Sequence, residues 1–503
     1  MRGEYHCQFM VRVSPIYVIW IFLLSGCIVD EQVVNPSLNK TPIGTSLSEQ
    51  NLFLEENVIA DDPMILTLDD AIQRALIANR GLIAAGDQVD FSQLSLVAAK
   101  SQFELKFRPS ASVGFGKHST SGSNKEYGTG LTIDKRFETG TSVSVTPRLD
   151  KASGSYQSGV DVSLSQPLLL GTDREYNMTA VDSAEFSERS AKRSLFLTRV
   201  STVVTTVSLV YRVVKQRELV GLNTQSADRL KALVSGTRAK EKIGLATSID
   251  TLRGELQLRH ALDTLILAKE SYGDALDDLR VQLSLPMDQS IEVDAPLVYD
   301  LIEIDESQAV IIALSERVEL DQARDYFSES QRYSRIAKHR TLPSLDLVFG
   351  YSQVGVNENL LDNFGLDDHV WNVNLATSTD FARTAEKAAY EQSLLGIRSA
   401  KRSLELQQDD IARQVKRDFR NLRRSENRIS IQEEQIQNSE ASMRLAKIKF
   451  DHGLANNFDL VEAEASLRQA ETNLVSAVVD YIVGSYRLRQ SLGTLLKQSE
   501  GTQ

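Results

Sequence analysis

Two carboxylates near the end of the chain are spaced so that they could act together. Asp459 and Glu462 lie three residues apart in a segment with helical periodicity, so both side chains share one face of the helix. Gathered from several copies of the chain, such pairs would attract cations. The plainer interpretation is that acidic residues in the first turn of a helix are stabilised by the helix dipole. The sequence leaves both interpretations open.

The other reactive residue types form no recognisable site. The six histidines are scattered without metal-ligand spacing, and the sequence contains no Walker loop and no G-x-S-x-G elbow. We therefore expect no enzyme activity, no metal site and no cofactor. The chain has 56 Lys and Arg against 68 Asp and Glu, a formal net charge of −12. Because no basic domain is present, nucleic acid is not expected as a partner.

The two cysteines, Cys7 and Cys27, both lie near the N-terminus, which excludes a disulfide framework and a cysteine zinc site. A basic start, an apolar run and the tetrad LSGC at 24–27 resemble a bacterial lipobox, so residues 1–26 are predicted to be a lipoprotein signal peptide. Cys27 would then carry lipid, and residues 27–63 would form a polar tether. Ile28 in place of Asp favours outer-membrane sorting. An ordinary signal peptide with a chance cysteine is the alternative.

Two proline-free tracts indicate very long helices. No proline falls between Pro167 and Pro286 or after Pro343, and proline breaks helix interiors. The sequence predicts helices over 172–243 and 382–451, each about 70 residues or roughly 105 Å long. A seven-residue apolar repeat, which is typical of a left-handed supercoil, runs through both tracts. Its positions are Val200, Val207 and Val214, and then Val415, Leu422, Ile429, Ile436, Met443 and Phe450. An ordinary bundle core could show the same stripe.

Between the helical tracts the period changes to two, which predicts strands. The six alternating segments, four in the first half and two in the second, are 110–116, 127–137, 142–149, 160–165, 345–351 and 371–375. The pattern fits transmembrane barrel strands and equally a half-buried soluble sheet. Export of the chain and aromatic residues near the strand ends favour the membrane. The smallest membrane barrels have about eight strands, and lipid tolerates no unpaired backbone. If these strands span a membrane, several copies must share one barrel.

The chain also repeats itself. The tripeptide Gly-Leu-Ala occurs at 244–246 and again at 453–455, each time four residues before an Asp, and matches such as Glu255 with Glu464 continue at the same offset. We predict a first structural repeat over 64–290, a connecting segment at 291–306, a second repeat over 307–496 and a tail at 497–503. The first half carries an extra hairpin at about 127–149.

These features resemble one known family. The lipobox, the opening "LTLDDAIQRALIANRGL", the strand end "LSQPLLLG", the strand start "LPSLDLVFGY" and the paired "GLAxx[IF]D" turns are similar to the TolC-type outer-membrane efflux family, lipoprotein branch, over about 64–496. The resemblance implies a mainly α, internally duplicated fold with a β-barrel part. Three copies would form a membrane β-barrel that continues into a periplasmic α-barrel of long coiled-coil helices.

The resemblance also implies partners and a role. The homotrimer would be the lipid-anchored exit duct of an efflux or type I secretion system. It would sit in outer-membrane lipid and dock a periplasmic adaptor (membrane fusion protein) and an inner-membrane pump of the RND, ABC or MFS type. A different class remains possible, a periplasmic coiled-coil lipoprotein acting as adaptor or structural spacer. The transported substrate is not encoded in any recognisable motif.

Site residues carry over from the family to the two helix–turn–helix tips. The predicted adaptor-docking residues are Gly244, Leu245, Ala246, Gly453, Leu454 and Ala455. Glycine allows a helix to end in a left-handed turn, and the adjacent leucine offers an apolar knob, although a plain C-cap is the alternative. Asp459 and Glu462 would line the periplasmic entrance as an acidic ring.

One feature departs from the family pattern. Members usually contribute four strands per copy, whereas six are predicted in this chain. Either the extra hairpin enlarges the barrel to about 18 strands, or it stands outside the membrane on the extracellular side. The sequence slightly favours the extracellular extension.

Overall fold

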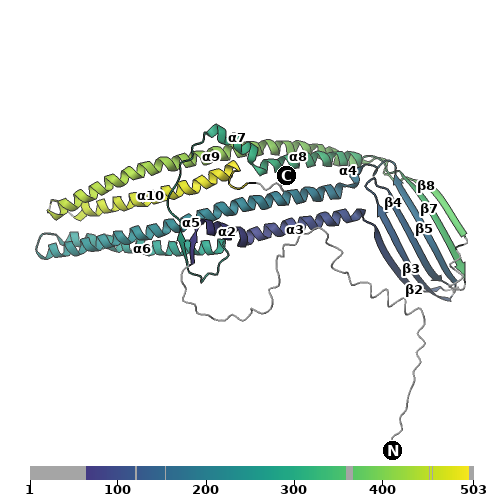
Figure 1. The fold of residues 1–503 in the computed structure, drawn as a ribbon, viewed down its shortest axis with the longest axis horizontal. Helices are drawn as coiled ribbons and strands as arrows, with labels where there is room; N and C mark the ends of the chain where they lie inside the picture. The colour runs from purple at the N-terminus through teal and green to yellow at the C-terminus, as the bar shows by residue number, and fades with distance from the viewer. Residues whose placement is uncertain are drawn as a thin grey trace, which may run out of the picture. The chain divides into compact units, whose positions relative to one another are not determined.

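The structure of the chain is a computed structural model. It describes residues 64–118, 122–152, 155–357, 366, 368–452, 454–455 and 457–497. The predicted signal peptide and tether, including Cys27, lie outside these residues, as does Gly453. Residues 62–503 form one compact unit, in which Figure 1 shows long helices that join a sheet.

Two very long helices dominate this unit. Helix α5 runs from Thr179 to Lys242 (64 residues) and α9 from Thr384 to Asp451 (68 residues), which confirms the helices predicted over 172–243 and 382–451. Each turns back into a shorter helix, α6 (Ser248–Gln282) or α10 (Asn457–Leu492). The turns of these two hairpins lie at the end of the helices away from the sheet (Figure 1).

The seven-residue stripe packs helix against helix within the chain. Its valines on α5 and the residues Val415, Leu422 and Ile429 on α9 are buried. Small residues that lie three positions after members of the stripe on α9 are buried as well: Ser425, Ser439 and Ala446 are 8%, 4% and 9% exposed. Small side chains at these positions leave room for α10, which packs along α9.

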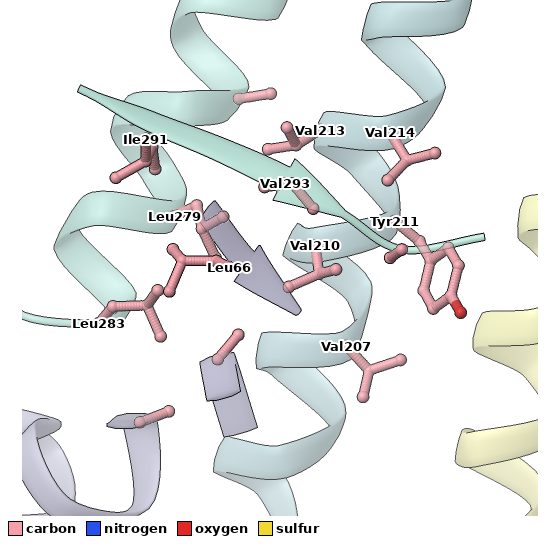
Figure 2. Close-up of a cluster of buried hydrophobic side chains, with 14 of the residues drawn as sticks. Leu66, Val207, Val210, Tyr211, Val213, Val214, Leu279, Leu283, Ile291 and Val293 are labelled. Carbon is pink, nitrogen blue, oxygen red and sulfur yellow. The ribbon is translucent and has the colours of Figure 1, made fainter. Parts of the chain in front are cut away.

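A small layer beside the long helices contains the main core. Strand β1 (Met64–Thr67) pairs in parallel with β6 (Ile291–Asp294), within what the sequence predicts to be a plain connecting segment at 291–306. Figure 2 shows Leu66 and Val293 from these strands among Val207 and Val210 of α5 and Leu279 of α6. Part of α5 is long and apolar enough to cross a membrane by composition alone. Burial of its valines in this core explains that composition.

The remaining helices complete a repeated order of elements. They are α2 (Leu68–Ala78), α3 (Arg80–Lys100), the 3₁₀ turn η3 (Ser101–Phe103), α4 (Arg174–Asn177), α7 (Glu306–Glu316) and α8 (Val318–His339). In each half, two helices lead to strands, then to a very long helix, a tight turn and a shorter helix. The boundaries that we assign to the two repeats stay a prediction.

Six strands form one antiparallel sheet, as the sequence predicts. They are β2 (Lys106–His118), β3 (Gly122–Arg136), β4 (Ser142–Ala152), β5 (Ser155–Pro167), β7 (Asp346–Asn357) and β8 (Asp368–Ala376). Their order is β2-β3-β4-β5-β7-β8, and every neighbouring pair is antiparallel. Strands from both halves of the chain therefore meet at the pairing of β5 with β7.

The period-two alternation gives the sheet one apolar and one polar face. One row of paired residues crosses all six strands on the apolar face: Phe107, Ile133, Val145, Val162, Tyr351 and Trp371. A row on the other face is polar or glycine throughout: Lys106, Asp134, Ser144, Ser163, Gly350 and Asn372. Apolar side chains near the sheet edges are exposed, Phe115 at 74% and Trp371 at 66%.

The extra hairpin lies within the sheet. The sequence slightly favours a position outside the membrane, on the extracellular side. In the structure β3 pairs with β2 on one side and β4 on the other, and β4 pairs with β5 along its full length. The alternating residues of the hairpin continue the faces of the neighbouring strands, which holds both strands in the sheet. Which part of the sheet lies in a membrane stays a prediction.

Candidate functional site

The first hairpin tip ends in a glycine-dependent helix cap. Gly244 has φ +77°, its N–H donates to the carbonyl of Glu241 at 2.9 Å, and the N–H of Leu245 donates to the carbonyl of Lys240 at 2.8 Å. These two bonds form a Schellman motif, which satisfies the last carbonyls of α5. In that motif the residue after the glycine usually packs back on its helix. Leu245 is instead 73% exposed, while Ala246 is half-buried.

The second tip repeats this geometry where it is described. The N–H of Leu454 donates to the carbonyl of Lys449 at 2.8 Å, the same spacing as at the first tip. Leu454 is 80% exposed and Ala455 is half-buried. Phe458 at the start of α10 is 55% exposed. The two tips therefore present apolar side chains to the surroundings, and a docking role for them stays a prediction.

The predicted acidic pair lies on the outward side of α10. Asp459 and Glu462 are exposed, whereas the residue after each of them, Leu460 and Ala463, is buried in a small core with Ala446 of α9. Helical geometry separates these two faces: the carboxylates are three positions apart and the buried pair is offset by one. The pair therefore shares one exposed face, as the sequence predicts. Whether copies of it form a ring stays a prediction.

The tip of the first hairpin differs chemically from the second. The matching residue of the first repeat is Asp250, and its side chain caps α6 by accepting the N–H of Thr247 at 3.2 Å. The position that matches Glu462 is Arg253. Only the second tip thus carries two carboxylates.

Among the described residues, no group of three or more His, Cys, Asp or Glu side chains is placed to hold a metal ion. Two cavities beside the long helices are lined mainly by polar side chains. One of about 230 Å³ lies between Asp418, Arg428 and Asp480, where Arg428 forms an ion pair with Asp480 at 3.4 Å. Its charged side chains are suited to solvation of a helical wall.

Comparisons with known proteins cover most of the chain. Residues 310–494 match the family described as Outer membrane efflux protein. Outer membrane protein TolC of Vibrio cholerae serotype O1 is 22% identical over 330 residues, which are 63% of this chain and 74% of that protein. The outer membrane channel CmeC of Campylobacter jejuni has a TM-score of 0.67 at 16% identity, covering 86% of this chain and 87% of that one. VceC of Vibrio cholerae has a TM-score of 0.67 at 15% identity, covering 85% and 96%.

These solved structures share the arrangement described above, long helices joined to an antiparallel sheet. Residues 310–494 thus match the Outer membrane efflux protein family, and the chain is similar to TolC. This similarity agrees with the resemblance to TolC-type efflux proteins found in the sequence, and the shared arrangement of long helices and antiparallel sheet confirms the mainly α fold class. An efflux family is not a class of enzymes, which agrees with the expectation drawn from the motifs.

The two hairpins are linked near their tips by contacts that the sequence did not predict. Nε of Arg229 on α5 donates to both carboxylate oxygens of Glu464 on α10, at 2.7 and 2.8 Å. Glu464 is only 3% exposed. The repeat had singled out Glu464 through its match with Glu255, but Glu255 pairs inside its own hairpin, with Arg238 at 3.0 Å. Nothing in the pattern predicted that the second glutamate crosses to the other hairpin.

Two further contacts join the hairpins. The side chain of Asn457, 2% exposed, donates to the carbonyl of Asp250 at 2.8 Å. The ammonium of Lys240 donates to the carbonyl of Phe450 at 2.9 Å and lies 3.8 Å from the centre of its ring. The tips of one chain are thus held together by a buried ion pair, a buried amide and a cation–π contact.

Proposed function

We propose that the chain is the outer-membrane exit duct of a tripartite efflux or type I secretion system, working as a homotrimer that conducts cargo passively. The observation that carries this proposal is a six-stranded sheet with one apolar face and two unpaired edges, joined to helical hairpins of more than sixty residues. The sheet suits outer-membrane lipid and the hairpins suit a tunnel through the periplasm. The match of residues 310–494 to the Outer membrane efflux protein family and the similarity to TolC support the same role.

The decisive experiment determines the oligomeric state of the protein in the outer membrane. Outer-membrane fractions of cells expressing the full chain should yield heat-modifiable trimers that need detergent for extraction. A Cys27→Ser variant that appears as a salt-soluble monomer would instead support a periplasmic adaptor or spacer lipoprotein.

A lipid anchor at Cys27 is the second part of the proposal. The tetrad LSGC at 24–27 and the polar stretch that follows support acylation at this residue. Mass spectrometry of the mature N-terminal peptide should show a lipid-modified cysteine as the first residue. An unmodified peptide beginning at another residue would contradict the anchor and leave the duct itself untouched.

The tips are proposed to dock a periplasmic adaptor, and through it an inner-membrane pump. Support comes from Leu245 and Leu454, which are 73% and 80% exposed although both flank helix ends. An adaptor helix could bury these knobs. Leu245→Asp and Leu454→Asp should abolish cross-linking to the adaptor encoded with this protein. Leu406→Asp is the matched control, because Leu406 is 60% exposed on α9 away from the tips.

Asp459 and Glu462 are proposed to form the acidic ring of the entrance, six carboxylates in a trimer. Their exposure on one face of α10 supports this arrangement. Planar-bilayer recordings of Asp459→Asn/Glu462→Gln should show reduced cation selectivity and weaker block by divalent cations. Glu433→Gln/Glu434→Gln removes the same charge from exposed positions of α9 and serves as the control. Equal selectivity in the two double variants would contradict the ring.

A further inference from the structure

The geometry points to a barrel that is wider than one built from four strands per copy. We infer that all six strands of each copy lie in the membrane wall, that β2 of one copy pairs with β8 of the next, and that three copies close an 18-stranded barrel. The inference rests on the proposed homotrimeric channel, and it names the surface through which the copies join: the two edges of the sheet.

The two edges are complementary in direction. Among the strands that the structure describes, β2 is paired only with β3 and β8 only with β7, so each has one row of backbone groups without a strand partner there. Five antiparallel steps separate β2 from β8, so the two edge strands run in opposite directions. A head-to-tail ring of copies therefore makes an antiparallel seam at every junction. Lipid requires such a seam, because unpaired backbone groups there cost several kcal/mol each.

The turn of the extra hairpin is fixed at the helical end of the sheet. Glu138 in this turn forms an ion pair with Nε of Arg174 of α4 at 2.6 Å. Gly140, with φ +83°, lies so close to the next segment that a Cβ would stand 2.2 Å from the carbonyl oxygen of Gly171. Asn177 of α4 donates to that same carbonyl at 2.7 Å. A hairpin held here by its turn runs along the sheet with its neighbours and cannot be an extension beyond the opposite end.

The faces of the hairpin match those of the wall. Ile133 and Val145 pair with each other and lie in the apolar row between Phe107 of β2 and Val162 of β5. Asp134 pairs with Lys106 and forms an ion pair with Arg108, both on the polar face of β2. A hairpin exposed to water on both sides would not need this alternation.

The strands are also long enough to span. Strands β3 and β4 have 15 and 11 residues, and a tilted transmembrane strand needs about 9–11. At a strand spacing of about 4.8 Å and a tilt of about 40°, 18 strands give a backbone diameter of about 36 Å, against about 24 Å for 12 strands. The inserted hairpin would thus widen the outer opening about 1.5-fold.

Disulfide trapping in the full-length protein tests the seam. Asn372→Cys in β8 is combined in turn with Ser110→Cys, Ser112→Cys or Gly114→Cys in β2, all on the polar face. Mild oxidation of intact cells should give covalent trimers on non-reducing gels for at least one of these pairs. Asn372→Cys with Val113→Cys is the control, because these residues lie on opposite faces and should remain uncoupled. Trimers present without any coupling would overturn the β2–β8 seam.

A second set of pairs tests where the hairpin lies. Ala111→Cys with Thr129→Cys, partners across β2 and β3, should form a disulfide within one copy in the assembled trimer. If the hairpin stood outside the wall, β2 would lie beside β5, and Ala111→Cys would couple to Val160→Cys or Val162→Cys. That second result in a heat-modifiable trimer would overturn the wide barrel and leave the proposed channel intact. Absence of any trimer on the same gels would contradict the proposed function itself.

Discussion

The buried ion pair between the hairpins gives a quantitative prediction. Replacing Arg229 with Met should loosen the attachment of α10 to α5 near the tips. Glu464 is 3% exposed and loses both of its hydrogen bonds to the guanidinium, at 2.7 and 2.8 Å. Breaking a buried pair by removing one partner costs about 3–5 kcal/mol. The carboxylate can take up a proton instead of staying charged, so we expect the lower end of this range, about 3 kcal/mol.

A loss of about 3 kcal/mol raises the population of the locally open state about 150-fold. Hydrogen exchange of the detergent-solubilised protein measures this directly, because amides protected by local structure exchange through that open state. In the Arg229→Met variant, peptides covering 457–467 should exchange much faster. Peptides covering the core segment 479–483 should be unchanged.

The double variant Arg229→Met/Glu464→Met separates the possible causes. If the unpaired carboxylate is responsible, replacing both partners with apolar residues should restore most of the protection. Exchange as fast as in the single variant would mean that the packing of Arg229, and not its charge, holds the hairpins. Unchanged exchange in Arg229→Met itself would refute the reasoning.

Three further predictions concern stability. Burial, together with the neighbouring Glu464, raises the pKa of Glu471 in the folded protein. The protonated carboxyl therefore stabilises the fold, and this contribution is lost as the pH rises above 4.5, the ordinary pKa of the group. Glu471→Gln should therefore raise the melting temperature at pH 7 and change it little at pH 4, as followed by circular dichroism. Asp325→Leu should destabilise the unit by about 3 kcal/mol in denaturant unfolding, since Arg193, 9% exposed, loses an ion pair at 2.7 Å. Leu245→Asn should leave unfolding within about 0.5 kcal/mol of the parent because the side chain is exposed, while adaptor cross-linking falls. A large loss of stability in that variant would favour the plain cap.

The long helices and the six strands could be predicted because their signals are local. A proline-free tract with a seven-residue stripe restricts the chain to helix whatever its neighbours are, and period-two alternation does the same for strands. The capped turn at Gly244 is local as well, since only the residue itself and its helix determine the positive φ. The acidic pair on one face of α10 follows from helical spacing alone.

The short parallel pair of strands β1 and β6 could not be predicted from the sequence. Each strand has four residues, and β1 contributes one buried side chain and β6 two, too few for a period to be read. They are strands because α5 and α6 supply an apolar surface on which Leu66 and Val293 become buried. A partner more than two hundred residues away determines their structure.

The sequence by itself determined the long helices, the six strands of the sheet and the glycine turns of the tips, because these depend on residue type and spacing along one segment. Tertiary structure alone decided that the extra hairpin lies inside the sheet and that Glu464 binds Arg229 and not a residue of its own hairpin. Both depend on which distant segment comes to lie beside the hairpin or beside α10. Strand and helix periods specify which face a residue occupies, but the neighbour on that face is chosen only when the whole unit packs.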